Sequence, residues 1–76
     1  MITIYGKDSC TFCDQAVQLC KQKGVDYEYK KLGVDFDKEW IVCHIGSYGV
    51  IPRTMPQVVD ENGYVGGFAE LKTKLM

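Results

Sequence analysis

The chain has 76 residues, of which 46% are hydrophobic and 25% are charged, an ordinary composition for one small globular domain. Nine Lys and Arg against ten Asp and Glu give a net charge of -1. This balance argues against the strongly basic surface typical of proteins that bind nucleic acid or an anionic membrane. We therefore expect residues 1–76 to form a single domain without a nucleic-acid partner.

The N-terminal segment MITIYGKDSC has no basic stretch followed by an apolar one, and no apolar run is long enough to span a bilayer. These features predict a cytoplasmic protein without a membrane partner. In a reducing cytosol, cysteines paired as Cys-x-x-Cys are more often catalytic or metal-binding than structural.

A strand, a helix and a second strand are predicted for the first 30 residues. Residues 1–5 (MITIY) are β-branched and aromatic, as in a buried strand, and Gly6 ends the run. Apolar residues then recur at helical spacing over residues 11–23, and Gly24 stands where a left-handed helix end is favoured. In residues 25–30 (VDYEYK) apolar or aromatic residues alternate with charged ones, as in a strand with one face exposed to solvent. Since a helix connects the two strands, we expect them to pair in parallel with a right-handed crossover.

The second half predicts a helix, a hairpin and a last helix. Residues 35–49 offer Asp35 or Asp37 as the N-cap of a helix. Residues 57–60 and 64–66 read as strands joined by a turn, and residues 68–76 as an amphipathic helix. The fold class is therefore α/β, a four-stranded mixed sheet with helices on both faces. The stripe expected on the middle helix consists of Trp40, Ile41, His44, Ile45 and Tyr48.

The motif KDSCTFC at residues 7–13 carries the chemistry. Cys10 falls between a strand and a helix, where unpaired N–H groups and the helix dipole favour its thiolate, and Lys7 adds a positive charge. Cys13 lies one helical turn further in, where it can attack a mixed disulfide formed at Cys10. A Cys-x-x-Cys pair at such a junction indicates thiol–disulfide chemistry, with a nucleophile and a resolving thiol.

A zinc site is the less favoured alternative, because four ligands are needed and only one closely spaced cysteine pair exists. We expect no metal ion. Cys20 falls on the apolar helix face and is expected to be a packed core residue. Cys43 remains open between a buried and an exposed position, and His44 is expected on a helix with one edge in water.

Three segments taken together resemble the glutaredoxins, and the short chain is similar to their small phage-type members. These are KDSCTFC after the first strand, TMPQVV at residues 54–59 and GYVGGFAEL at residues 63–71. The resemblance implies a thioredoxin-like fold with three helices. It also implies an enzyme that reduces protein disulfides and glutathione mixed disulfides, with glutathione as co-substrate and no bound cofactor.

The resemblance also implies roles for individual residues. Cys10 matches the family's nucleophile, Cys13 its resolving cysteine and Lys7 its basic residue. The Met55–Pro56 bond matches a cis peptide bond, which would leave the Met55 backbone free to pair with glutathione; a trans proline at a strand edge is the alternative. The glutathione contacts implied are Phe12, Arg53, Thr54, Met55, Pro56, Gly67, Phe68 and Ala69.

Several of these contacts have a simpler competing explanation or depart from the family. Arg53 either pairs with the glycine carboxylate of glutathione or is a solvated loop residue. Gly67 and its neighbour either allow a glutathione carboxylate to reach the next helix N-terminus or form only a tight turn. Thr11 replaces a common proline. Ala69 stands where the family often has Asp or Ser facing the amino end of glutathione, and Glu70 is a candidate replacement.

The expected partners follow from the same resemblance. They are glutathione and disulfide-containing protein clients such as ribonucleotide reductase, with the chain acting as a monomer in electron transport. Two alternatives remain open. One is a redox carrier reduced by thioredoxin reductase, and the other a binder of an iron–sulfur cluster held between two protomers by Cys10 and glutathione.

Overall fold

The structure is a computed structural model that describes all residues from Met1 to Met76. The elements follow the order β1 (Ile2–Gly6), α1 (Thr11–Lys23), β2 (Tyr27–Lys31), α2 (Lys38–Gly46), β3 (Gln57–Asp60), β4 (Gly63–Gly66) and α3 (Phe68–Leu75). The four strands form one sheet in the order β2-β1-β3-β4. Strand β1 pairs parallel with β2 and antiparallel with β3, and β3 pairs antiparallel with β4. The predicted fold class is confirmed.

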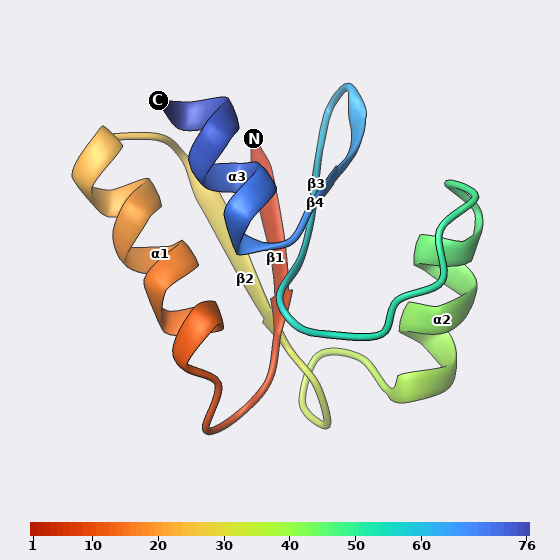
Figure 1. Ribbon diagram of the computed structural model, residues 1–76. Coiled ribbons are helices and arrows are strands. Elements are labelled where there is room, and N and C mark those ends of the chain that lie inside the picture. Colours follow the sequence, from red (N-terminus) through yellow and green to blue (C-terminus); the bar gives the residue numbers. More distant parts are fainter.

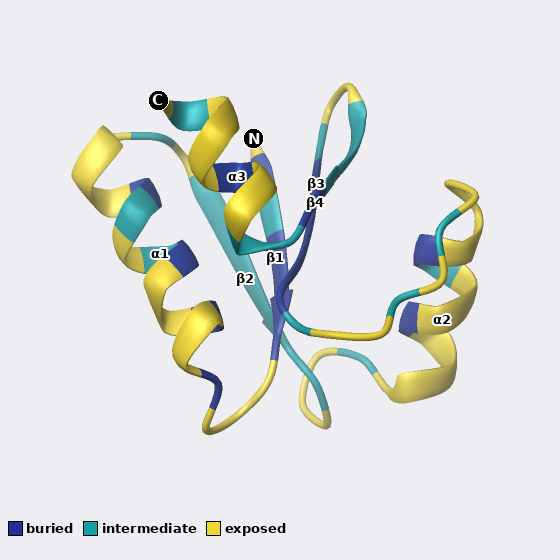
Figure 2. Ribbon diagram, viewed as in Figure 1, coloured by how far each residue is buried: buried dark blue, intermediate teal, exposed yellow.

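The sheet separates two layers of helices. Helices α1 and α3 cover one face, and α2 lies alone on the other (Figure 1). Because successive strand residues point to opposite faces, β1 sends Ile2 and Ile4 into the core beneath α1 and α3. Tyr5 points the other way and packs with Ile41 and Ile45 of α2. The central strands are therefore buried on both faces, as the dark blue of β1 and β3 shows (Figure 2).

Helix α1 has the predicted bounds, and its C-terminal cap explains a shift in the next strand. Gly24 adopts φ 66° in the left-handed region, and the N–H of Val25 donates to the carbonyl of Cys20 at 3.0 Å. Since the Val25 N–H is hydrogen-bonded to the end of the helix, it cannot also donate to a neighbouring strand. Strand β2 therefore begins at Tyr27, two residues later than predicted.

Helix α2 is shorter and less buried than the predicted stripe. Asp37 is its N-cap, accepting from the N–H of Trp40 at 2.7 Å, and the helix ends at Gly46. Only Ile41 and Ile45 are buried, whereas the Trp40 side chain is 44% exposed. The ring of Trp40 instead stacks on that of His44, with centroids 4.6 Å apart. The helix thus touches the sheet along a narrow line, and no helix of the chain is both long and apolar enough to cross a bilayer.

Asp60 joins the β3–β4 turn to the last turn of α3. Its carboxylate accepts from the N–H of Asn62 at 2.8 Å and pairs with Lys74. The Asp60 side chain is only 5% exposed. The Lys74 hydrogen bond, followed by backbone N–H donors, lowers the pKa of the Asp60 carboxyl below its ordinary value.

Asp60→Asn is expected to lower the free energy of unfolding at neutral pH by about 1–2 kcal/mol, because a charge-assisted contact is lost. A pKa that is lower in the folded chain gives stability that is present above the unfolded pKa and lost as pH falls through the folded value. Urea unfolding of the wild type between about pH 6 and pH 2 should therefore show a steeper acid decline than Asp60→Asn. Asp26→Asn, at an exposed carboxylate without an ion pair, is the matched control. Equal acid slopes for Asp60→Asn and wild type would contradict this assignment.

Candidate active site

Cys10 is the N-cap of α1, so the helix begins at a sulfur atom. The chain turns from β1 into the helix through Ser9, whose φ of 55° is the one positive value at a non-glycine residue. The Cys10 Sγ accepts from the N–H of Cys13 at 3.2 Å, as an N-cap side chain does. This donor and the helix dipole stabilise negative charge on the Cys10 sulfur, which favours thiolate over thiol once the residue is reduced.

Cys10 and Cys13 form a disulfide, with their Cα atoms 5.2 Å apart. Cys10 is 8% exposed and Cys13 is fully buried. Cys10 therefore keeps a small contact with solvent, whereas Cys13 has none. The arrangement can support nucleophilic attack by Cys10 and internal resolution by Cys13.

The segment before β3 lies against the disulfide. The Met55–Pro56 peptide bond is cis, and the Met55 carbonyl oxygen lies 3.8 Å from the Cys10 Sγ. The N–H and C=O of Met55 form no hydrogen bond with other backbone groups. An extended peptide passing the disulfide can therefore pair with Met55 as it would with a strand edge.

Gln57 holds this segment in place, a role that the sequence did not reveal. Its side chain is 4% exposed, and its Nε2 donates to the Thr54 carbonyl at 2.6 Å. The Tyr64 hydroxyl donates to the Gln57 Oε1, also at 2.6 Å. The buried amide thereby fixes the turn that presents Met55, and no pattern within residues 54–57 identifies Tyr64 as its partner.

A groove of about 280 Å³ opens on one side of Met55, and we call it the apolar groove. It brings together seven of the eight residues predicted to contact glutathione, and adds Glu70 to them. The ring of Phe12 is 58% exposed and lies 6.0 Å from that of Phe68, between centroids, so the two rings form one wall. The residues lining the apolar groove are Phe12, Thr54, Met55, Pro56, Gly67, Phe68, Ala69 and Glu70.

Glu70 folds back over the start of α3. Its Oε1 accepts from the N–H of Gly67 at 2.7 Å. A Cβ on Gly66, which has φ 134°, would lie 2.6 Å from the Glu70 Cγ, so glycine is required there. The N–H groups of Phe68 and Ala69 form no backbone hydrogen bond and remain available at the positive end of the helix. The spacing of Glu70 three residues after the N-cap is the capping-box signal that indicates its position.

A second groove of about 280 Å³, which we call the cationic groove, lies on the other side of Met55. Two predicted site residues, Lys7 and Arg53, line it, so they lie apart from the aromatic wall. Thr54 and Met55 line both grooves. The residues lining the cationic groove are Lys7, Leu32, Lys38, Ile41, Val42, Pro52, Arg53, Thr54 and Met55.

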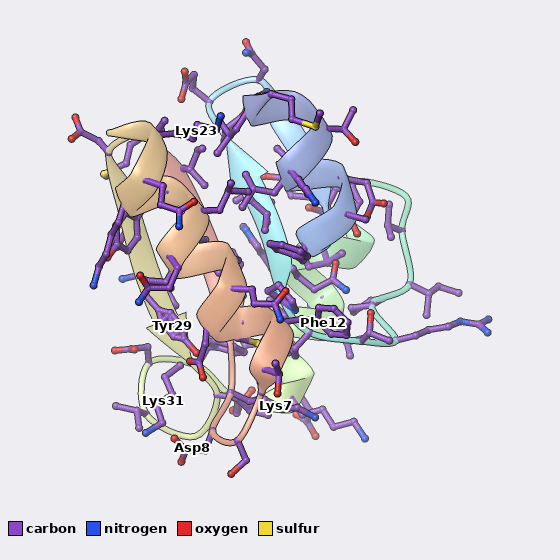
Figure 3. All side chains as sticks on the ribbon, turned by 60° about the vertical axis from the view of Figure 1, so that its left-hand side comes forward. Lys7, Asp8, Phe12, Lys23, Tyr29 and Lys31 are labelled. Carbon is purple, nitrogen blue, oxygen red and sulfur yellow. A yellow bond between two sulfur atoms is a disulfide. The ribbon has the colours of Figure 1, made fainter.

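Strand β2 ties down the loop that carries Cys10. The Tyr29 hydroxyl donates to the Lys7 carbonyl at 3.4 Å, and Lys31 forms an ion pair of 2.6 Å with Asp8. Figure 3 shows these four side chains gathered beside the start of α1. Burial raises the pKa of the Tyr29 hydroxyl, and the hydrogen bond with Asp8 raises that of Lys31. The Tyr29 ring reaches the loop only because Gly6 has no side chain, since a Cβ there would lie 2.4 Å from the hydroxyl oxygen.

The other candidate ligands lie away from the disulfide. Cys20 is fully buried, which confirms the expected packing role, and burial raises the pKa of its thiol. Cys43 is exposed on α2. The Nε2 of His44 lies 3.4 Å from the hydroxyl oxygen of Tyr5. No group of three or more His, Cys, Asp or Glu side chains has a metal-binding arrangement.

The family model for glutaredoxin matches residues 2–64, which leaves Gly66 and α3 outside the match. Glutaredoxin 1 from Francisella tularensis, crystallised with cacodylate, superposes with a TM-score of 0.79 at 21% identity, over 96% of this chain and 88% of that one. The buckwheat glutaredoxin–glutathione complex gives 0.78 at 24% identity, over 96% of this chain and 66% of that one. The glutaredoxin from Archaeoglobus fulgidus gives 0.69 at 26% identity, with coverages of 96% and 80%. No curated protein matches the chain significantly.

Gly6→Ala is expected to lower the free energy of unfolding by about 1–3 kcal/mol, because the new methyl group displaces the Tyr29 ring. Tyr29→Phe removes the hydroxyl oxygen, which is the atom nearest to that methyl group. In the Tyr29→Phe background, Gly6→Ala should therefore lower the free energy of unfolding by less. Urea unfolding of the two single variants, the double variant and the wild type gives this coupling directly. Strictly additive effects would contradict the close contact.

Proposed function

This chain belongs to the glutaredoxin family of thiol–disulfide oxidoreductases, and from that premise we propose that it is a dithiol glutaredoxin that uses glutathione as its reductant. The observation that carries the proposal is the Cys10–Cys13 pair at the start of α1, beside the free backbone groups of Met55. To capture a cysteine-containing peptide, a site needs a reactive sulfur and a backbone segment whose hydrogen-bonding groups are unpaired.

The proposed reaction proceeds by two thiol exchanges. The Cys10 thiolate attacks one sulfur of a client disulfide, forms a mixed disulfide and releases the other client sulfur as a thiolate. The Cys13 thiolate then attacks the Cys10 sulfur, which frees the second client thiol and forms the Cys10–Cys13 disulfide. Two glutathione molecules reduce that disulfide in the same manner and leave as oxidised glutathione, so the two electrons balance.

For glutathione we propose a pose that runs from the apolar groove across Met55 to the cationic groove. The γ-glutamyl carboxylate would meet the free N–H groups of Phe68 and Ala69, and the cysteine residue would pair with Met55. The glycine carboxylate would face Lys7 and Arg53. The groove linings and the unpaired N–H groups support this pose.

Glu70 has a specific part in this proposal. Ala69 offers no side-chain carboxylate, whereas the Glu70 carboxylate lines the apolar groove and is held there by the Gly67 N–H. We propose that Glu70 faces the ammonium group of glutathione, with charge attraction replacing the contact that Ala69 lacks.

The setting of the reaction belongs to the same proposal. Residues 1–76 would act as one glutaredoxin-like domain and as a monomer in the cytoplasm, where a reducing glutathione pool keeps the pair reduced. Ribonucleotide reductase is the client class we propose for its electron-transfer role, and the family resemblance is its support.

Cys10→Ser is expected to abolish turnover of a glutathione mixed disulfide of a small thiol, assayed with NADPH, glutathione and glutathione reductase. Cys13→Ser is expected to retain that turnover, because glutathione itself can resolve the mixed disulfide, and to lose reduction of protein disulfides. Cys43→Ser is the control for an exposed thiol outside the site. Full activity in Cys10→Ser would overturn the assignment, and turnover only with thioredoxin reductase would favour a carrier recharged by that enzyme.

Glu70→Gln is expected to raise the KM for glutathione about 3- to 10-fold, the effect of losing one charge pair at a partly exposed site, with little change in kcat. Gln keeps an oxygen acceptor for the Gly67 N–H, so the start of α3 is preserved. Steady-state kinetics over a range of glutathione concentrations separate the two constants. An unchanged KM would remove Glu70 from the glutathione site.

A further inference from the structure

The cationic groove carries three positive side chains and no negative one. Lys7, Lys38 and Arg53 all line it, and none of them takes part in any of the chain's four ion pairs. Of the other lysines, Lys30, Lys31 and Lys74 are each paired with a carboxylate. The remaining unpaired lysines, Lys21, Lys23 and Lys72, do not line this groove. The groove therefore concentrates unpaired positive charge in a chain whose net charge is -1.

Lys38 occupies a position that the helix itself does not favour. It is the first residue of α2, where the dipole favours acidic side chains and disfavours cations. The start of the helix is already satisfied by Asp37, which accepts from the N–H of Trp40. A lysine there adds nothing to helix stability, and its side chain lines the cationic groove.

Apolar residues also line the cationic groove. They are Leu32, Ile41, Val42, Pro52 and Met55. A volume of about 280 Å³ accommodates a few side chains of an extended segment but not a folded domain. A lining of apolar and cationic side chains is complementary to a peptide that carries both apolar side chains and carboxylates.

The groove is continuous with the reactive centre. Met55 lines both grooves, and its carbonyl oxygen lies 3.8 Å from the Cys10 Sγ. A peptide whose cysteine is attacked by Cys10 while it pairs with Met55 must extend into the cationic groove on one side. In the pose proposed above, that side is C-terminal to the attacked cysteine.

We infer that the cationic groove binds an acidic segment of the protein client, C-terminal to its attacked cysteine, and that Lys38 determines this specificity. The inference rests on the proposed function and extends it to the class of client. Glutathione offers one carboxylate at this end, which leaves surplus positive charge among three cations. A client with two or more acidic residues beyond its cysteine neutralises the groove more fully.

The test compares two short peptides that differ only beyond their single cysteine, where one carries two Glu residues and the other two Gln residues. Each is supplied as a pyridyl disulfide to the fully reduced protein without glutathione. The Cys10 thiolate bonds to the peptide sulfur, the disulfide bond between the peptide sulfur and the pyridyl sulfur breaks, and the released pyridine thiolate takes up a proton to give thiopyridone, whose absorbance reports the rate. At low salt the acidic peptide is expected to react about 3- to 10-fold faster.

Lys38→Gln is expected to lower that ratio about twofold or more, because one of the three groove cations is lost, and raised salt should lower it in the wild type. Lys38→Glu should lower the ratio further than Lys38→Gln, because it also adds a negative charge to the groove lining. Lys23→Gln, the same charge loss at the far end of α1 (Figure 3), should leave the ratio unchanged. The pyridyl disulfide of a small uncharged thiol should react equally with wild type and Lys38→Gln.

Equal rates for the two peptides in the wild type, or a ratio unaffected by Lys38→Gln, would overturn the inference. This outcome is separable from failure of the proposed function, because the peptide reaction contains no glutathione. Glutathione turnover without charge preference would reject only the acidic client. Charge preference without glutathione turnover would reject only the glutathione dependence.

Discussion

The chemistry of this chain depends on one contact, the hydrogen bond from the N–H of Cys13 to the sulfur of Cys10. That bond makes the Cys10 sulfur the cap of α1, where a carboxylate or a hydroxyl is more usual. The start of the helix therefore stabilises a thiolate once Cys10 is reduced. The same turn of helix buries Cys13 completely while Cys10 keeps a small exposed area. The two cysteines therefore differ in exposure because of a single helical turn, and this difference supports the roles proposed for them.

The sheet fixes the position of the first turn of α1, which carries the two cysteines. Strand β1 is buried on both faces and leads directly into the loop before Cys10. Strand β2 restrains the same loop through Tyr29 and Lys31. The Tyr29 ring fits there because Gly6 has no side chain. On the other side, Gln57 fixes the segment that presents Met55. A rigid scaffold thus supports both the reactive sulfur and the peptide edge beside it.

Two grooves of similar size meet at Met55 and differ in chemistry. One has an aromatic wall and ends at the start of α3, where Glu70 folds back on Gly67. The other carries unpaired cations. Helix α2 contacts the sheet through the buried Ile41 and Ile45 and through Trp40 and His44. The Trp40 and His44 rings lie against Tyr5 of β1, and Lys38 in the first turn lines the second groove. The difference between the two grooves suits a peptide substrate whose two ends differ in charge and polarity.

Much of this could be predicted from the sequence, because the relevant signals are local. The bounds of α1, its left-handed cap at Gly24, the β3–β4 hairpin and the placement of Cys10 at a helix start all follow from periodicity and from residue types at neighbouring positions. The resemblance to glutaredoxins then indicated the residues that line the apolar groove.

Contacts between residues far apart in the chain could be seen only in the folded molecule. Trp40 satisfies helical periodicity yet stays partly exposed, since periodicity does not reveal how narrow the contact with the sheet is. The hydrogen bond from Tyr64 to Gln57, and the gathering of Lys7, Lys38 and Arg53, join side chains brought together by chain reversals. The helices, the strands and the cysteine pair can be read from the sequence, because they depend on residues that are near neighbours in the chain. The shape and charge of the grooves depend on packing between elements, which only the folded chain defines.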